Sequence, residues 1–273
     1  MQNYSVHPFE MVKSFWRNKR LIMQLSKREV LGRYRGSALG LSWSFFNPIL
    51  MLIIYTFVFS VIFKARWGNE TGESKTEFAI ILFVGLLIHG FFAECINRSP
   101  SLITSNVSYV KKVVFPLEIL PWVAFTSALF HSCISLVVLL FAQLILNHNI
   151  PSTAILFPIV ILPLFLGIMG LSWLFASLGV YLRDIAQITA MFSTILLFMS
   201  AVFFPITALP EKYQFWIRIN PLASIIEQSR NVLVFGRLPN FWALLIMLAV
   251  GALIAWCGFV WFQKTRKGFA DVL

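Results

Sequence analysis

The sequence predicts an all-α polytopic membrane protein, and three observations support this fold class. The chain of 273 residues is 59% hydrophobic and 12% charged, whereas soluble domains carry about 25% charged residues. Residues 39–63 are all uncharged, and at about 1.5 Å per helical residue such a run crosses a hydrocarbon core of about 30 Å. Residues 119–182 also carry no formal charge, and that run is long enough for two crossings.

Residues 1–36 predict a basic arm that contains a helix lying on the membrane. More than half of the net charge of +11 is concentrated in this arm. That concentration suits an anionic inner leaflet better than a nucleic-acid-binding surface spread over a domain. Over residues 9–29, helical periodicity separates two sets of side chains, the pattern of an interfacial amphipathic helix. The basic side carries Lys13, Arg17, Arg20, Gln24 and Lys27, and the opposite side carries Met11, Phe15, Ile22 and Leu25. The alternative is a generic basic flank that only orients the first span.

Six spans are predicted along the chain, separated by polar or proline-containing segments. They cover about residues 39–63, 78–97, 119–146, 153–181, 186–204 and 240–263. Pro48 is expected to kink the first span. Gly32, Gly36 and Gly40 precede that span at intervals of four, either as loop glycines or as one small helix face for close packing. The three cysteines, Cys95, Cys133 and Cys257, lie in apolar runs and are expected to be small core residues without disulfides.

The distribution of Lys and Arg predicts the orientation of the six spans. Most of the 22 Lys and Arg residues lie in the segments that this topology places inside the cell. Basic residues are enriched in cytoplasmic segments, so both termini are expected to be cytoplasmic. The expected divisions of the single domain, residues 1–273, are the inner arm 1–36, spans one to five in 37–204, an outer hairpin in 205–239, and the last span with its cytoplasmic tail in 240–273.

The segment from residue 205 to residue 239 is not predicted to span the membrane. Four prolines, Pro205, Pro210, Pro221 and Pro239, divide it into short pieces. Residues 210–219 and 222–235 look helical and amphipathic, but each is too short to span a bilayer. We expect two short helices in a hairpin on the outer face. Backbone of this kind at membrane depth must be buried in protein or line a cavity.

Several chemical functions are excluded by what the sequence lacks. There is no GxxxxGK[ST] phosphate loop, no Cys/His cluster at metal-binding spacing and no G-x-S-x-G elbow. We therefore assign no catalytic residue, metal site or cofactor to this chain. Glu94 lies in an apolar run, and because an intramembrane carboxylate is costly it is expected to face protein or water, or to lie near the inner interface. A remote alternative is a glycan-modifying membrane enzyme, which would use residues such as His89, His131, Glu94 or Asp184.

Aromatic residues are unusually abundant, with 28 Phe and nine Trp. Tyr55, Phe59 and Phe63 share a helix face at i, i+4 and i+8, and Phe192 and Phe198 lie in the fifth span. Aromatic side chains in membrane helices usually pack in the core or contact lipid. The more specific hypothesis is that these five residues line a conduit in which flat rings stack on the sugars of a passing glycan.

Four stretches carry a resemblance to a known family. They are REVLGRYRGSALGLSWSFFNPILMLIIYTFVFSVIF (28–63), NVSYVKKVVFPLEILP (106–121), LGVYLRDIAQ (178–187) and FFPITALPEKYQFWIRINPLASIIEQSRNVL (203–233). In order and spacing the chain resembles the membrane (permease) subunit of ABC-2-type polysaccharide and O-antigen exporters, the Wzm/TagG/KpsM group. The resemblance covers nearly the whole chain.

This resemblance implies a function and an assembly. It implies a homodimer in the bacterial cytoplasmic (inner) membrane that encloses a channel for a lipid-linked, O-antigen-like polysaccharide. Two copies of a separate ATPase subunit would bind ATP and Mg²⁺ and drive export. Alternatives with the same fold export teichoic acid, capsular polysaccharide or a small lipophilic compound.

The resemblance also implies roles for individual residues. The interface helix at the ATPase would use Lys13, Arg17, Arg20, Lys27 and Arg28. The coupling segment, residues 99–116, would use Asn106, Tyr109, Lys111, Lys112, Phe115 and Pro116. The outer gate would use Pro205, Pro210, Trp216 and Pro221.

Overall fold

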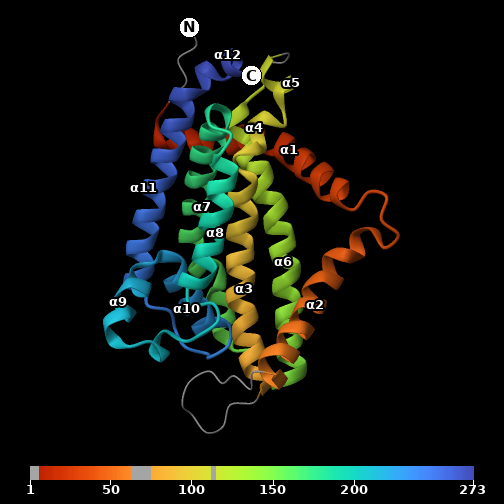
Figure 1. The fold of residues 1–273 in the computed structure, drawn as a ribbon, viewed down its shortest axis with the longest axis vertical. Coiled ribbons are helices and arrows are strands. Elements are labelled where there is room, and N and C mark those ends of the chain that lie inside the picture. Colours follow the sequence, from red (N-terminus) through yellow and green to blue (C-terminus); the bar gives the residue numbers. More distant parts are fainter. Residues whose placement is uncertain (1–5, 63–74, 112–114) are drawn as a thin grey trace.

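A computed structural model describes residues 6–62, 75–111 and 115–273, and within these residues the chain is a bundle of helices without strands (Figure 1). This confirms the predicted all-α membrane class. Phe63 and Lys112, two of the predicted site residues, lie outside the described residues.

The apolar helices form the body of the bundle; most run along its long axis, and α2 is oblique to the others (Figure 1). They are α2 (Trp43–Tyr55, continued as a π-helix over Thr56–Ile62), α3 (Lys75–Arg98), α6 (Leu120–Asn147), α7 (Phe157–Tyr181), α8 (Ile185–Met199) and α11 (Phe241–Thr265). Five segments are long and apolar enough to span a membrane: Gly40–Phe59, Glu77–Arg98, Leu117–Asn147, Ser152–Tyr181 and Phe241–Val272. The sixth, α8, is apolar but shorter.

The remaining helices gather at the two ends of the bundle. One end, called here the α1 end, carries α1 (Pro8–Arg33), α4 (Ser101–Thr104), α5 (Val107–Lys111) and α12 (Phe269–Val272) (Figure 1). The opposite end, called here the hairpin end, carries α9 (Glu211–Ile219) and α10 (Pro221–Leu233) (Figure 1). The predicted short helices are thus present, with bounds within two residues of those expected from the prolines.

The fifth span is shorter than the predicted 186–204. Helix α8 ends at Met199, and at about 1.5 Å per residue it is about 22 Å long, less than a hydrocarbon core of about 30 Å. The chain turns at Ala201, whose φ is +52°. The carbonyls of Ala201 and Val202 then accept hydrogen bonds from the Arg230 guanidinium at 2.8 and 2.7 Å. Arg230, 29 residues further along the chain, therefore binds backbone carbonyls that follow the end of the helix.

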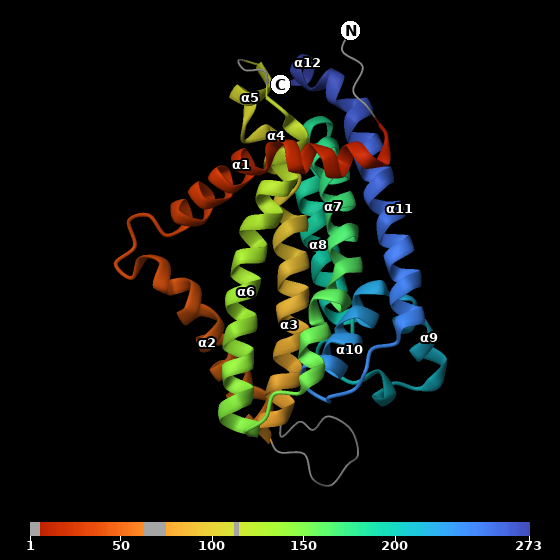
Figure 2. The ribbon, with the colours of Figure 1, turned by 180° about the vertical axis from the view of Figure 1, so that it is seen from behind.

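Helix α3 is the centre of the bundle, whereas α2 stands at its margin. In the apolar window of α3, 78% of the residues are buried, compared with 11% in that of α2. Figure 2 shows α2 leaning away from the other helices where it approaches α1. Most of the surface of α2 is therefore available to lipid or to another protein.

Helices α7 and α11 pack with direct backbone contact. A Cβ added to Gly258 would overlap the carbonyl of Gly170, and a Cβ added to Gly251 would lie 2.7 Å from the Pro163 carbonyl oxygen. Glycine at these positions lets the two helices approach more closely than larger residues would allow.

Two smaller predictions are settled by these positions. Gly36 and Gly40 have φ of +84° and +52° and meet no atoms at an added Cβ, so they are loop glycines rather than a packing face. Cys95 is buried as expected, but Cys133 and Cys257 are exposed, so the prediction of a core position was wrong for those two. Their apolar surroundings in the sequence belong to helix faces at the bundle surface.

Candidate functional site

Helix α1 lies across the end of the bundle (Figure 2) and has one basic, exposed face and one packed face. Ile22 is 1% exposed and packs with Ile119 and Val123, and the Ser26 hydroxyl donates to the Val123 carbonyl at 3.3 Å. The predicted basic residues of the interface helix, Lys13, Arg17, Arg20, Lys27 and Arg28, are all exposed. The predicted division of this helix into two faces is therefore present in the structure.

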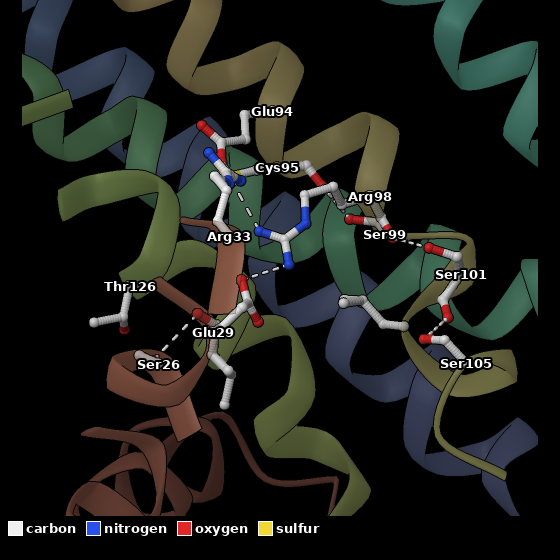
Figure 3. A network of polar contacts seen from close by, with 12 residues as sticks. Ser26, Glu29, Arg33, Glu94, Cys95, Arg98, Ser99, Ser101, Ser105 and Thr126 are labelled. Carbon is white, nitrogen blue, oxygen red and sulfur yellow. Dashed lines mark hydrogen bonds and ion pairs between the residues drawn. The ribbon is translucent and has the colours of Figure 1, made fainter. Parts of the chain in front are cut away.

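Two ion pairs join α1 to the end of α3 (Figure 3). Arg33 pairs with Glu94, and Arg98 pairs with Glu29 while its other nitrogen lies 3.8 Å from Glu94. On each helix the acid and the base are four residues apart, so they share a face and meet their partners across the helix contact. We call these four residues the α1–α3 ion-pair cluster. Glu94 thus lies near the α1 end and faces protein, in agreement with the expectation that it would avoid lipid.

A second charged contact centres on Glu118, which is 5% exposed. Its carboxylate accepts from Arg266 at 2.5 Å and from the Ser14 hydroxyl at 3.2 Å. Arg266 also donates to the Phe115 carbonyl at 2.9 Å. One buried carboxylate thereby joins α1, the start of α6 and the C-terminal end of α11. Sequence reasoning did not assign this role to Glu118, although its position directly before a long uncharged run was a usable signal.

The predicted coupling segment forms a small folded unit beside α1. The rings of Tyr109 and Phe115 stack with centroids 4.4 Å apart, and Arg28 donates to the Tyr109 hydroxyl at 3.1 Å. Asn106 donates to the Leu102 carbonyl at 2.9 Å and Pro116 precedes the helical turn Leu117–Ile119. Lys111 ends α5 and is exposed. The structure therefore brings the described part of the predicted segment against the predicted interface helix at Arg28.

At the hairpin end, the prolines mark helix boundaries as predicted. Pro210 directly precedes α9, and Pro221 is the first residue of α10. Pro205 directly precedes a short helical turn. Trp216 on α9 is 66% exposed. Asn220 donates to the Met199 carbonyl at 3.1 Å and to the Ser200 hydroxyl at 2.9 Å, so the hairpin is attached to the end of α8.

Arg230 on α10 is the main polar anchor of the hairpin. It is 3% exposed, and besides Ala201 and Val202 it binds the Ile81 carbonyl at 3.1 Å. Burial lowers the pKa of Arg230 to about 9, so the guanidinium still carries its charge at neutral pH. Three carbonyl acceptors satisfy a cation that would otherwise be costly to bury. This role of Arg230 could not be predicted from the sequence, because its partners are backbone carbonyls.

Two of the predicted channel aromatics, Phe59 and Phe198, contact the same ring, Phe203. Phe59 packs between Phe78 and Phe203, with ring centroids 5.8 and 6.0 Å apart. Phe198 is 60% exposed, and Phe192 is partly exposed beside Phe92. Tyr55 instead lines a cavity beneath α2.

This α2 cavity has a volume of about 430 Å³ and lies between α2, α3, α6 and the end of α1. Its polar lining residues are Arg33, Tyr34, Ser44, Asn47, Tyr55, His89, Glu94, His131, Ser132 and Ser135. Two further cavities, of about 390 and 170 Å³, are lined almost entirely by apolar side chains. Within the described residues, no group of His, Cys, Asp and Glu side chains is arranged to hold a metal ion.

A bundle of membrane-spanning helices with an amphipathic helix across one end and a short helical hairpin at the other defines a membrane-embedded transporter domain. The chain belongs to the ABC-2 type transporter family, whose model matches residues 20–234. It is therefore a transporter permease subunit rather than an enzyme.

Curated relatives cover almost the whole chain. The O-antigen export system permease protein RfbA of Myxococcus xanthus is 26% identical over 263 residues, which is 96% of this chain and 98% of the relative. The protein of the same name from Klebsiella pneumoniae is 26% identical over 93% of this chain and 95% of its own length. The polysialic acid transport protein KpsM of Escherichia coli is 22% identical over 77% of this chain and 79% of its own length.

Proposed function

We propose that this protein is the channel-forming permease subunit of an ATP-driven exporter that moves a lipid-linked, O-antigen-like polysaccharide across the bacterial inner membrane. The observation that carries this proposal is the similarity to O-antigen export permeases along 96% of the chain. The similarity to the polysialic acid and capsule polysaccharide transporters favours capsular polysaccharide as a second candidate substrate.

The working assembly in this proposal is a homodimer with two ATPase subunits, which bind ATP and Mg²⁺. The sparse burial of α2 supports a second copy of the chain as its partner. The apolar residues Ile188, Met191, Ile195 and Phe198 of α8 are exposed and offer a second surface for the same contact. Each protomer would cross the membrane six times, with α8 and its following turn completing the short fifth crossing.

The ATPase would dock at the α1 end, on the cytoplasmic side of the membrane. The exposed basic face of α1 and the adjoining α4–α5 segment offer the docking surface. A displacement of α1 would reach the bundle through the α1–α3 ion-pair cluster and through Glu118. The hairpin at the opposite end would act as the outer gate. Its two helices are too short to cross the membrane, and Asn220 and Arg230 attach them to the end of α8, so the hairpin and α8 would move together.

Reconstitution with the cognate ATPase subunit of the source organism would test the proposal. The two proteins should co-purify, and ATP hydrolysis in proteoliposomes should rise with a lipid-linked glycan more than with the lipid carrier alone. An O-antigen glycolipid and a capsular glycolipid, compared side by side, would separate the two candidate substrates. Failure of every glycolipid to be transported by an assembled, ATP-hydrolysing complex would refute polysaccharide export.

A variant set would test the coupling role within the same assay. Alanine at Lys111, Lys112 and Phe115 should leave assembly and folding intact but uncouple ATP hydrolysis from export. Normal export by this triple variant would overturn the assignment of the coupling segment.

A further inference from the structure

The α2 cavity is lined by many polar side chains, although it lies among membrane-spanning helices. At about 430 Å³ it falls within the range of roughly 300–1,000 Å³ typical of small-molecule sites. His89 lies nine residues before Arg98, the end of α3, which places it about 14 Å into the bundle. His131 and Ser135 of α6 line the cavity about 16 and 22 Å from the start of that helix.

Polar side chains at membrane depth are costly unless they bond to other protein groups or serve a water-filled or ligand-binding space. Some of the lining groups bond within the protein: His89 Nε2 to the Ser193 carbonyl at 2.9 Å, and the Ser135 hydroxyl to the His131 carbonyl at 3.1 Å. Asn47 on α2 is exposed and lines the cavity, and its amide forms no hydrogen bond with another described residue. The Nε2 atom of His131 is buried and has no hydrogen-bond partner in the part of the chain that the structure describes. The cavity therefore has unused hydrogen-bonding capacity at a depth where lipid supplies none.

The charges around the cavity indicate what kind of ligand fits. Arg33 and Glu94 line it, but they pair with each other, and Glu94 also lies near Arg98. A phosphate would find no uncompensated cation there and would have to compete with the Glu94 carboxylate. A neutral molecule rich in hydroxyls would instead meet amide, imidazole and hydroxyl groups that can both donate and accept.

Aromatic side chains complete the match. Tyr55 of α2 and Phe83 of α3 both line the cavity and offer apolar faces beside the polar groups. A sugar ring has the same division, with hydroxyls at its edge and C–H groups on its faces. In contrast, the cavity between α7 and α11 is lined by apolar residues alone and suits a lipid chain.

We propose that the α2 cavity binds one uncharged sugar residue of the transported glycan within each protomer. This inference rests on the proposed function and adds a defined subsite to it, formed by α2, α3 and α6. The subsite takes polar groups from two helices that differ in how tightly they are packed. Helix α3 is the buried centre of the bundle, and α2 is the least buried of the spanning helices. Movement of α2 would therefore change the affinity of the subsite for the sugar.

Gly90 provides a direct test, because it lines the cavity and a Cβ added there meets no atom within 4 Å. Gly90→Leu should therefore fill the space without displacing the backbone. Gly167→Leu is the matched control, since Gly167 also lies in a membrane-spanning helix with open space at its Cβ but lines the apolar cavity beside α8. Asn47→Leu removes a polar group and serves as a second variant if Gly90→Leu does not assemble.

The probe is the oligosaccharide released by mild acid from the lipid-linked glycan of the source organism, with binding to the permease–ATPase complex measured by saturation-transfer NMR. Its affinity should fall about tenfold or more in Gly90→Leu and in Asn47→Leu, and stay within about twofold of the original in Gly167→Leu. Inorganic phosphate should not compete. Unchanged binding in both cavity variants, or competition by phosphate, would overturn the sugar subsite.

Failure of the subsite can be told apart from failure of the proposed function. If the lipid-linked glycan is exported by the original protein and by Gly90→Leu at equal rates, the subsite is refuted and polysaccharide export stands. If neither the probe binds nor any glycolipid is transported, both are refuted.

Discussion

The contact between Glu118 and Arg266 should be the most destabilising charged contact to break at the α1 end. Their side chains are 7% and 10% exposed, and the nitrogen and oxygen are 2.5 Å apart. Removing one partner of a buried pair costs about 3–5 kcal/mol, because the other charge stays buried without its counter-charge. Glu118→Gln and Arg266→Met should each cost about this much.

The double variant separates a paired contact from two independent ones. In Glu118→Gln with Arg266→Met neither buried charge remains, so its loss should be well below the sum of the two single losses. Arg17→Met is the control: Arg17 lies 3.9 Å from Glu118 but is 52% exposed, and such a contact is worth at most about 1 kcal/mol.

Thermal unfolding of the purified permease in detergent would measure these effects. At roughly 2–4 °C per kcal/mol, each single variant should lower the midpoint by about 6–20 °C. Arg17→Met should lower it by no more than about 4 °C. Strictly additive losses in the double variant would refute the reasoning, because they would mean that the two side chains do not interact.

Three further outcomes are expected. Arg230→Met should sharply reduce the yield of monodisperse protein in size-exclusion chromatography, since three carbonyls lose their donor at about 1–3 kcal/mol each; a normal yield would contradict the anchoring role. The charge exchange Glu29→Arg with Arg98→Glu should restore most of the export activity lost in either single variant, as measured in proteoliposomes, and no rescue would argue against the pairing. Gly258→Val should lower the unfolding temperature through its clash with α7, whereas Gly32→Ala, with open space at its Cβ, should not.

The helices could be predicted from sequence because the signals that define them are local. Hydropathy locates the long spans, and the alternation of basic and apolar residues separates the two faces of α1. Pro210 and Pro221 mark the starts of the hairpin helices because the fixed φ of proline suits the first turn of a helix. These features need no knowledge of distant residues.

The polar contacts of the site could not be predicted, because their partners are far apart in the chain. Glu118 and Arg266 are separated by 148 residues, and Arg230 reaches Ile81 across 149. The end of α8 was misplaced for the same reason: residues 200–204 are as apolar as a helix requires, but the carbonyls of Met199, Ala201 and Val202 bind side chains of the distant hairpin instead of continuing the helix. Aromatic periodicity identifies a helix face but not what lies against it, so the contacts of Phe59 with Phe78 and Phe203 could not be predicted from the sequence.

The backbone contact of Gly170 with Gly258 determines which helices of each protomer can move and which cannot. Because no side chains separate α7 from α11 there, neither helix can slide or rotate against the other without losing that fit. The pair therefore forms a fixed wall, and a passage for a wide cargo must widen by shifting other helices, such as the sparsely buried α2 and the exposed face of α8. Spin labels placed across α7 and α11 would keep one constant separation throughout the ATP cycle, while labels on α2 and α8 would not.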